Sequence, residues 1–120
     1  MNTWTLWQYR SIANSFLAQC DPEMQEMLTW RLGLLLEKGI ECKMPVSEPL
    51  GDGLFALHAR CKKVRVRLIY YFGEKKQIIF VHATYKDTPK IGQHNITIAK
   101  RNRDIIREGK ERLYDFNFTS

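Results

Sequence analysis

The chain has 120 residues, of which 44% are hydrophobic and 27% charged, and this balance excludes a disordered chain and predicts a single folded domain over residues 1–120. No apolar run approaches the roughly 20 residues that a membrane span needs, and the N-terminus lacks the pattern of a signal peptide. The net charge of +6 is uneven, because residues 1–59 carry four Lys/Arg and seven Asp/Glu, whereas residues 60–120 carry fifteen and six. The basic half indicates an anionic partner, and aromatic residues among its charges favour nucleic acid over a merely solvated basic surface.

The three cysteines, Cys20, Cys42 and Cys61, show no CxxC spacing. An odd number of cysteines without a secretion signal indicates reduced thiols in a cytoplasm. The spacing also argues against a zinc site, so we expect neither a metal nor another cofactor.

The first half of the chain predicts one strand and two helices. Trp and Tyr recur in Thr3–Tyr9, which favours a strand, and Ser11–Cys20 has helical apolar spacing. Asp21 suits an N-cap and is followed by proline, which predicts a second helix from Pro22 to about Lys38, with Gly39 just past its end. We expect the two helices to form a hairpin over one face of a sheet. The stripe of the second helix is more typical of core than of a binding groove, and it consists of Met24, Met27, Leu28, Leu32, Leu35 and Leu36.

The middle of the chain predicts a loop and a three-stranded antiparallel meander. Glu41–Asp52 contains two prolines and indicates a loop. Strands are predicted in the apolar run that ends at Ala59, in Val64–Phe72 and in Gln77–Tyr85. Alternation in the second of these strands places Val64, Val66, Leu68, Tyr70 and Phe72 toward the helices. The opposite face then carries Arg65, Arg67, Ile69 and Tyr71, and we interpret it as a phosphate-binding face, the alternative being ordinary solvated arginines.

The last third of the chain predicts a basic helix and a tail. Thr88-Pro89 resembles an N-cap with a first-turn proline, and the apolar pattern extends to about Arg112. The tail, Leu113–Ser120, either adds an edge strand or stays mobile. The complete order predicts an α+β fold with an N-terminal strand, a helical hairpin, the meander and a C-terminal helix.

Four segments in order resemble one known family. Pro49–Leu57 (PLGDGLFAL) resembles the PLGDGLYEL segment of the HigB-like, phage-derived branch of the RelE/ParE toxin superfamily. Arg67–Phe72 (RLIYYF) is similar to that branch's RVLYFF strand, and Val81–Lys86, followed by Thr88-Pro89, is similar to its LHGFxKKT…TP segment. Ala99–Arg101 resembles part of the helix that follows. The similarity covers roughly residues 11–107.

This resemblance implies a RelE-like fold and a toxin of a type II toxin–antitoxin system. Its partners are then a cognate antitoxin, of the helix-turn-helix type, together with the ribosome and mRNA. For many members it implies cleavage of mRNA in the ribosomal A site, with no metal, by attack of the RNA 2′-hydroxyl on the adjacent phosphate.

Such chemistry needs a proton acceptor and cations beside the phosphate. Arg67 and Lys86 fall on the basic positions of the family and are the expected catalytic cations. His58 is the expected proton acceptor, because imidazole titrates closest to neutral pH. Four further residues are expected to bind RNA, by phosphate contact or, for the tyrosine, by stacking on a base: Arg65, Tyr71, Lys100 and Arg101.

Two positions depart from the family pattern, and they leave alternatives open. His58 stands where the family often has arginine, and Lys86-Asp87 stands where it has two lysines. His58 is otherwise a structural histidine, and we expect His82 to be structural and His94 to lie on the surface. The alternative functions are a toxin of the same fold that inhibits another target, such as DNA gyrase, and a non-catalytic nucleic-acid-binding module.

Overall fold

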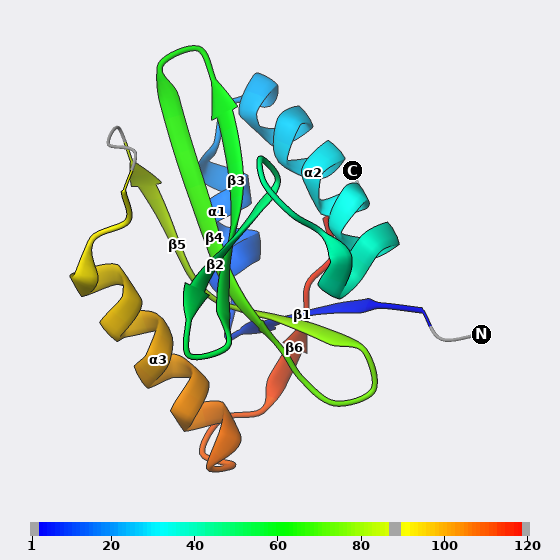
Figure 1. The fold of residues 1–120 in the computed structure, drawn as a ribbon, viewed down its shortest axis with the longest axis vertical. Helices are drawn as coiled ribbons and strands as arrows, with labels where there is room; N and C mark the ends of the chain where they lie inside the picture. The colour runs from blue at the N-terminus through cyan, green and yellow to red at the C-terminus, as the bar shows by residue number, and fades with distance from the viewer. Residues whose placement is uncertain (1–2, 87–89, 119–120) are drawn as a thin grey trace.

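The computed structural model describes residues 3–86 and 90–118, which form a sheet between two helical layers (Figure 1). Helices α1 (Ile12–Gln19) and α2 (Pro22–Lys38) cover one face of the sheet, and α3 (Gln93–Arg107) covers the other. The predicted α+β fold, with its strand, helices, meander and final helix in that order, is confirmed. Within the described residues, no helix is long and apolar enough to cross a membrane.

The sheet is larger than the predicted meander. It has six strands in the spatial order β2 (Ser47–Gly51), β3 (Leu54–Cys61), β4 (Val64–Phe72), β5 (Gln77–Lys86), β1 (Thr5–Tyr9) and β6 (Leu113–Asp115). The antiparallel pairs β3–β4 and β4–β5 confirm the meander. The first strand runs parallel to β5, and the tail adds β6 antiparallel to β1, which settles the open question about the tail in favour of an edge strand.

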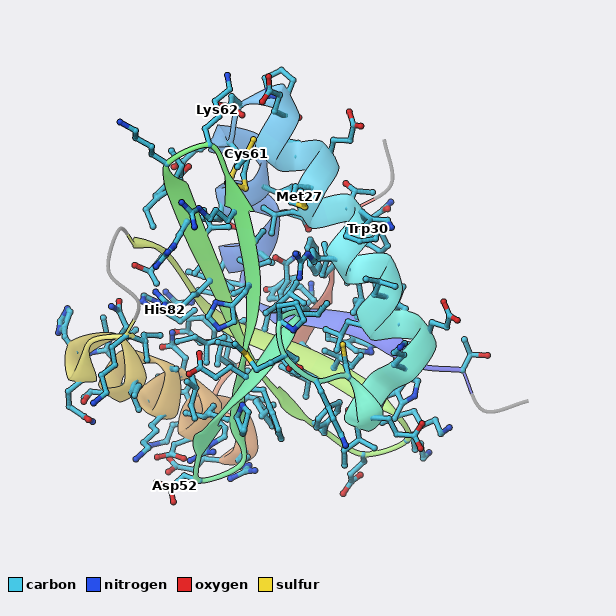
Figure 2. All side chains as sticks on the ribbon, turned by 45° about the horizontal axis from the view of Figure 1, so that its top comes forward. Met27, Trp30, Asp52, Cys61, Lys62 and His82 are labelled. Atoms are coloured by element: carbon cyan, nitrogen blue, oxygen red, sulfur yellow. The ribbon has the colours of Figure 1, made fainter. Side chains whose placement is uncertain are left out.

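The helical hairpin forms for the reasons that its sequence indicates. The Asp21 carboxylate accepts a hydrogen bond from the Met24 backbone N–H at 3.0 Å and so caps α2. Gly39 ends the helix with a φ of +56°, where a Cβ would meet the Trp4 ring. The stripe of α2 lies in the core, since Leu28, Leu32 and Leu35 are fully buried and Met24 is 3% exposed. Its methionines therefore pack against the sheet, including the partly buried Met27 (Figure 2).

The prediction of a loop over Glu41–Asp52 was wrong in part, because β2 lies within it. Pro49 argued against a strand at this position because proline has no backbone N–H to donate. However, β2 is an edge strand, where a missing backbone donor is tolerated. On the face of the sheet that α1 and α2 cover, the Ser47 hydroxyl is hydrogen-bonded to the Tyr70 hydroxyl. Ser47 is 1% exposed and Tyr70 is fully buried. This buried contact anchors β2 to the centre of the sheet.

The last helix is shorter than predicted at both ends. It begins at Gln93 and ends at Arg107 rather than near Arg112, because Gly109 adopts a φ of +74° and reverses the chain. The proposed cap at Thr88-Pro89 lies outside the described residues. Ala99 is fully buried in a cluster with Ile69 and Tyr71, and this contact fixes α3 over the arginine-bearing side of the sheet.

Candidate functional site

The strand register gathers the predicted basic residues on one face. His58 of β3 lies opposite Arg67 of β4, and Arg60 lies opposite Arg65. Because side chains alternate along a strand, these four residues point to the side that α3 covers. We call His58, Arg60, Arg65 and Arg67 the arginine face. It occupies the part of the β3–β4 hairpin toward Cys61, beyond the apolar contacts of α3.

The strand β5 extends this face across the sheet. Thr84 lies opposite Arg67, and the backbone of Lys86 lies opposite Arg65. The backbone of Lys86 therefore lies beside the arginine face, while its side chain and Asp87 lie outside the described part of the chain.

A carboxylate that the sequence analysis missed, Glu48, joins the arginine face from β2. Its Oε1 lies 2.6 Å from Nε2 of His58, and the two side chains are 36% and 21% exposed. The His58 backbone N–H also donates to the Val46 carbonyl at 2.8 Å, which ties β2 to β3 beside the pair. The prolines on either side of Glu48 concealed its strand, so no local pattern marked this residue as part of the site.

The structure buries Arg67, which corrects its predicted role in direct phosphate contact. Its side chain is 1% exposed, so a bidentate contact with RNA does not fit this arrangement. Burial lowers the pKa of the Arg67 guanidinium; the nearby Glu48 charge opposes this shift and Arg65 adds to it. Arg67 thus places a positive charge beneath the face, while the partly exposed Arg65 and the exposed Arg60 are the cations at its surface.

The prediction that Tyr71 stacks on a base was wrong for this conformation. Tyr71 is 4% exposed and lies beneath α3, with the Arg107 guanidinium carbon 5.1 Å from the centre of its ring. Burial raises the pKa of the Tyr71 phenol, and the charges of Arg107 and Arg103 oppose that shift. Its alternation with Arg67 placed Tyr71 on the correct face, but the position of α3 over that face depends on contacts distant in sequence.

The two basic residues predicted on α3 have different surroundings. Lys100 Nζ lies 2.6 Å from Oδ2 of Asp52, at the turn between β2 and β3 (Figure 2). The charge of Lys100 is therefore paired at the end of β3 that is farther from the arginine face. Arg101 is exposed and available to solvent.

His82 is partly exposed and lies between β5 and α3 (Figure 2). Its Nε2 lies 2.8 Å from Oδ1 of Asn95, a hydrogen bond that joins β5 to α3. Burial lowers the pKa of His82, and the hydrogen bond to Asn95 opposes this shift. These contacts agree with the structural role expected for His82, and His94 is exposed as expected.

The arrangement has the components of acid–base chemistry on a phosphate. It combines an imidazole held by a carboxylate, two surface guanidiniums and a buried third one. Across residues 3–86 and 90–118, no three His, Cys, Asp or Glu side chains gather as ligands for a metal ion.

Comparison with known protein families identifies a match. A sequence profile of the family "Phage derived protein Gp49-like (DUF891)" matches residues 15–104, which is three quarters of the chain. No curated protein matches significantly. The matched region runs from α1 to α3 and contains β2, β3, β4 and β5, and with them the whole arginine face. The chain therefore belongs to the Gp49-like family of phage-derived proteins, within the RelE/ParE-like toxin superfamily.

Proposed function

We propose that this chain is the toxin of a type II toxin–antitoxin system and that it acts as a metal-free endoribonuclease on mRNA in the cytoplasm. The observation that carries this proposal is the register of β3 and β4, which sets His58 beside three arginines on one face. Membership in a toxin-like family supports the toxin role and implies an antitoxin partner. The ribosome and a helix-turn-helix antitoxin are the partners that the resemblance to the HigB-like branch adds.

The proposed reaction breaks one RNA strand without water as the nucleophile. The 2′-oxygen forms a bond to the adjacent phosphorus while the bond from phosphorus to the 5′-oxygen breaks. His58 accepts the proton of the 2′-hydroxyl, and the departing 5′-oxygen takes a proton from solvent. The products are a 2′,3′-cyclic phosphate and a 5′-hydroxyl end.

The arginines stabilise the charge that develops on the phosphate. Arg65 and Arg60 can contact phosphate oxygens at the surface, whereas the buried Arg67 acts through its field in a site of low dielectric constant. Lys86 remains a proposed second cation because its backbone lies opposite Arg65.

The test is inducible expression with mapping of mRNA 5′ ends, combined with in vitro cleavage in the presence and absence of purified ribosomes. The wild-type chain should arrest growth and produce new 5′-hydroxyl ends. His58→Ala should lower the cleavage rate by roughly 100-fold or more, the usual contribution of a general base. His94→Ala is the matched control, since His94 is exposed on α3, and it should retain activity.

Intact mRNA during growth arrest by the wild-type chain would exclude the nuclease and favour another target. Full activity of His58→Ala would remove His58 from the reaction. Cleavage that proceeds equally without ribosomes would remove the ribosome from the proposal while leaving the nuclease.

A further inference from the structure

Glu48 is a carboxylate beside a face that carries three arginines and His58. A carboxylate beside a phosphate-binding surface repels the substrate, since like charges disfavour approach. Glu48 nevertheless stands on that face, 36% exposed, with its Oε1 on His58. Its contact with the imidazole is the interaction that distinguishes Glu48 from the other groups on this face.

The backbone fixes Glu48 and His58 relative to each other. The His58 N–H donates to the Val46 carbonyl, and the register pairs Ser47 with Leu57 and Glu48 with Ala56. Because successive side chains of a strand point to opposite faces, the buried contact of Ser47 with Tyr70 turns Glu48 to the arginine face. The strand pairing thus places the Glu48 and His58 side chains on the same face, where their 2.6 Å contact forms.

The hydrogen bond also selects one ring nitrogen. A carboxylate only accepts hydrogen bonds, so the imidazole must donate, and the atom in contact is Nε2. In the neutral ring with its proton on Nε2, the other nitrogen carries the lone pair that accepts a proton. Arg67, opposite His58 in the register, adds a positive charge that interacts with Glu48 on the same face.

We propose that Glu48 is a positioning residue that holds His58 in the Nε2–H tautomer, so that Nδ1 receives the proton of the attacking 2′-hydroxyl. This inference rests on the proposed nuclease function for its catalytic consequence. The effect on the tautomer does not depend on that function, and it can be measured without substrate.

The first measurement is the tautomer itself, read from the ¹⁵N chemical shifts of the His58 ring at a pH where the ring is neutral. The wild-type protein should show the Nε2–H form in large excess. Glu48→Ala should mix the two tautomers, and Glu48→Asp should restore part of the excess. Glu74→Ala removes an exposed carboxylate from the turn between β4 and β5 and should change nothing.

The second measurement is mRNA cleavage in the presence of purified ribosomes by the same four proteins. Glu48→Ala should lower kcat by on the order of 10–100-fold, part of the contribution of a general base, with KM unchanged or lower because a repulsive charge is gone. Glu48→Asp should recover part of kcat. A rise in KM with kcat unchanged would show that Glu48 serves binding only and would overturn the proposal.

The two measurements separate the two ideas. If wild-type protein cleaves RNA and Glu48→Ala keeps both tautomer and kcat, the positioning role fails while the nuclease stands. If no protein cleaves RNA, the nuclease fails, and the tautomer ratio alone decides whether Glu48 orients His58. Circular dichroism and thermal unfolding of each variant exclude loss of fold as the cause of any change.

Discussion

At the scale of single residues, Arg67 determines the character of the site. A guanidinium that is 1% exposed loses most of its hydration, and this loss lowers its pKa. Such a side chain fills volume in the sheet as well as carrying charge. Alternation correctly placed Arg67 on the face of His58, but no sequence pattern distinguishes a buried arginine from an exposed one.

The volume and the charge of Arg67 can be separated by two substitutions. Arg67→Ala should lower the free energy of unfolding by about 2–5 kcal/mol, the usual range when a large buried side chain is truncated. Arg67→Met keeps most of the volume and should cost less than about 1.5 kcal/mol, because buried charges are often replaced by apolar groups with little loss. Urea unfolding gives both values. Equal losses in the two variants would show that the guanidinium's own contacts, not its volume, stabilise the sheet.

A second residue-scale prediction concerns the hydroxyl pair that anchors β2. Tyr70→Phe leaves the buried Ser47 hydroxyl without this partner and should lower the free energy of unfolding by about 1–3 kcal/mol at neutral pH. Tyr114→Phe, at an exposed tyrosine in β6, is the control.

Tyr70→Phe should also change how the free energy of unfolding depends on pH above pH 10. Burial raises the pKa of Tyr70 from 10.0 to about 12, so the unfolded chain loses the phenolic proton first. The contribution of Tyr70 is fully present below pH 10 and is lost as the pH rises toward 12. The difference in stability between wild type and Tyr70→Phe should therefore shrink over this range, and a constant difference would contradict the assignment.

At the scale of elements, the turn Gly51-Asp52-Gly53 explains why the PLGDG segment is so distinctive. All three residues have positive φ, which favours glycine and tolerates aspartate. The turn presents the Asp52 carbonyl to Arg103 and the Asp52 carboxylate to Lys100, and both partners lie on α3. The segment that carries the family resemblance thus holds the last helix against the sheet.

Asp52→Asn tests this link without disturbing the backbone, because asparagine also tolerates positive φ and the carbonyl contact remains. Hydrogen exchange of the α3 amides should accelerate by on the order of a few-fold, with α2 unaffected. Glu37→Gln, at an exposed carboxylate on α2, is the matched control.

The pH dependence gives the sign of the Asp52 effect. The hydrogen bond and charge of Lys100 lower the pKa of the Asp52 carboxyl below 3.8, so its stabilising contribution is present above that pH and disappears as the pH falls. Wild type and Asp52→Asn should converge in α3 exchange only at pH values below the lowered pKa of Asp52. A difference that persists there would indicate that the carboxylate charge is not the cause.

Local sequence patterns predicted the helices and strands themselves better than they predicted which strands pair with each other. Caps and periodicity predicted α2 from Pro22 to Lys38, and alternation predicted β4 from Val64 to Phe72, both as observed. The parallel pairing of β1 with β5 brings together segments about 70 residues apart, which no local pattern can show. The same holds for the candidate site. Alternation along the strands predicted that Arg65 and Arg67 share a face, and His58 was also identified from the sequence. Glu48 was missed because its place in the site depends on the pairing of an edge strand that contains proline.

At the scale of the whole molecule, the helices of the acidic and basic halves of the sequence lie on opposite sides of the sheet. The acidic half of the chain supplies α1 and α2, whose exposed residues include Glu23, Glu26 and Glu37. The basic half supplies β4, β5 and α3, and with them the arginines on the opposite side of the sheet. A polyanion should therefore approach the side of the sheet that carries α3 rather than the helical hairpin (Figure 1).

The salt dependence of RNA binding tests this orientation. A single-stranded RNA with 2′-O-methyl groups lacks the attacking hydroxyl, so binding can be measured without cleavage. Each phosphate contact contributes about 0.7 to the slope of log Kobs against log salt concentration, because counterions leave the RNA. Arg65→Ala should weaken binding to all sequences alike and reduce the slope by about 0.7 for one lost contact. Lys38→Ala removes an exposed cation at the end of α2 and should leave both values unchanged. Equal reductions in the two variants would mean that net charge, and not the arginine face, attracts the RNA.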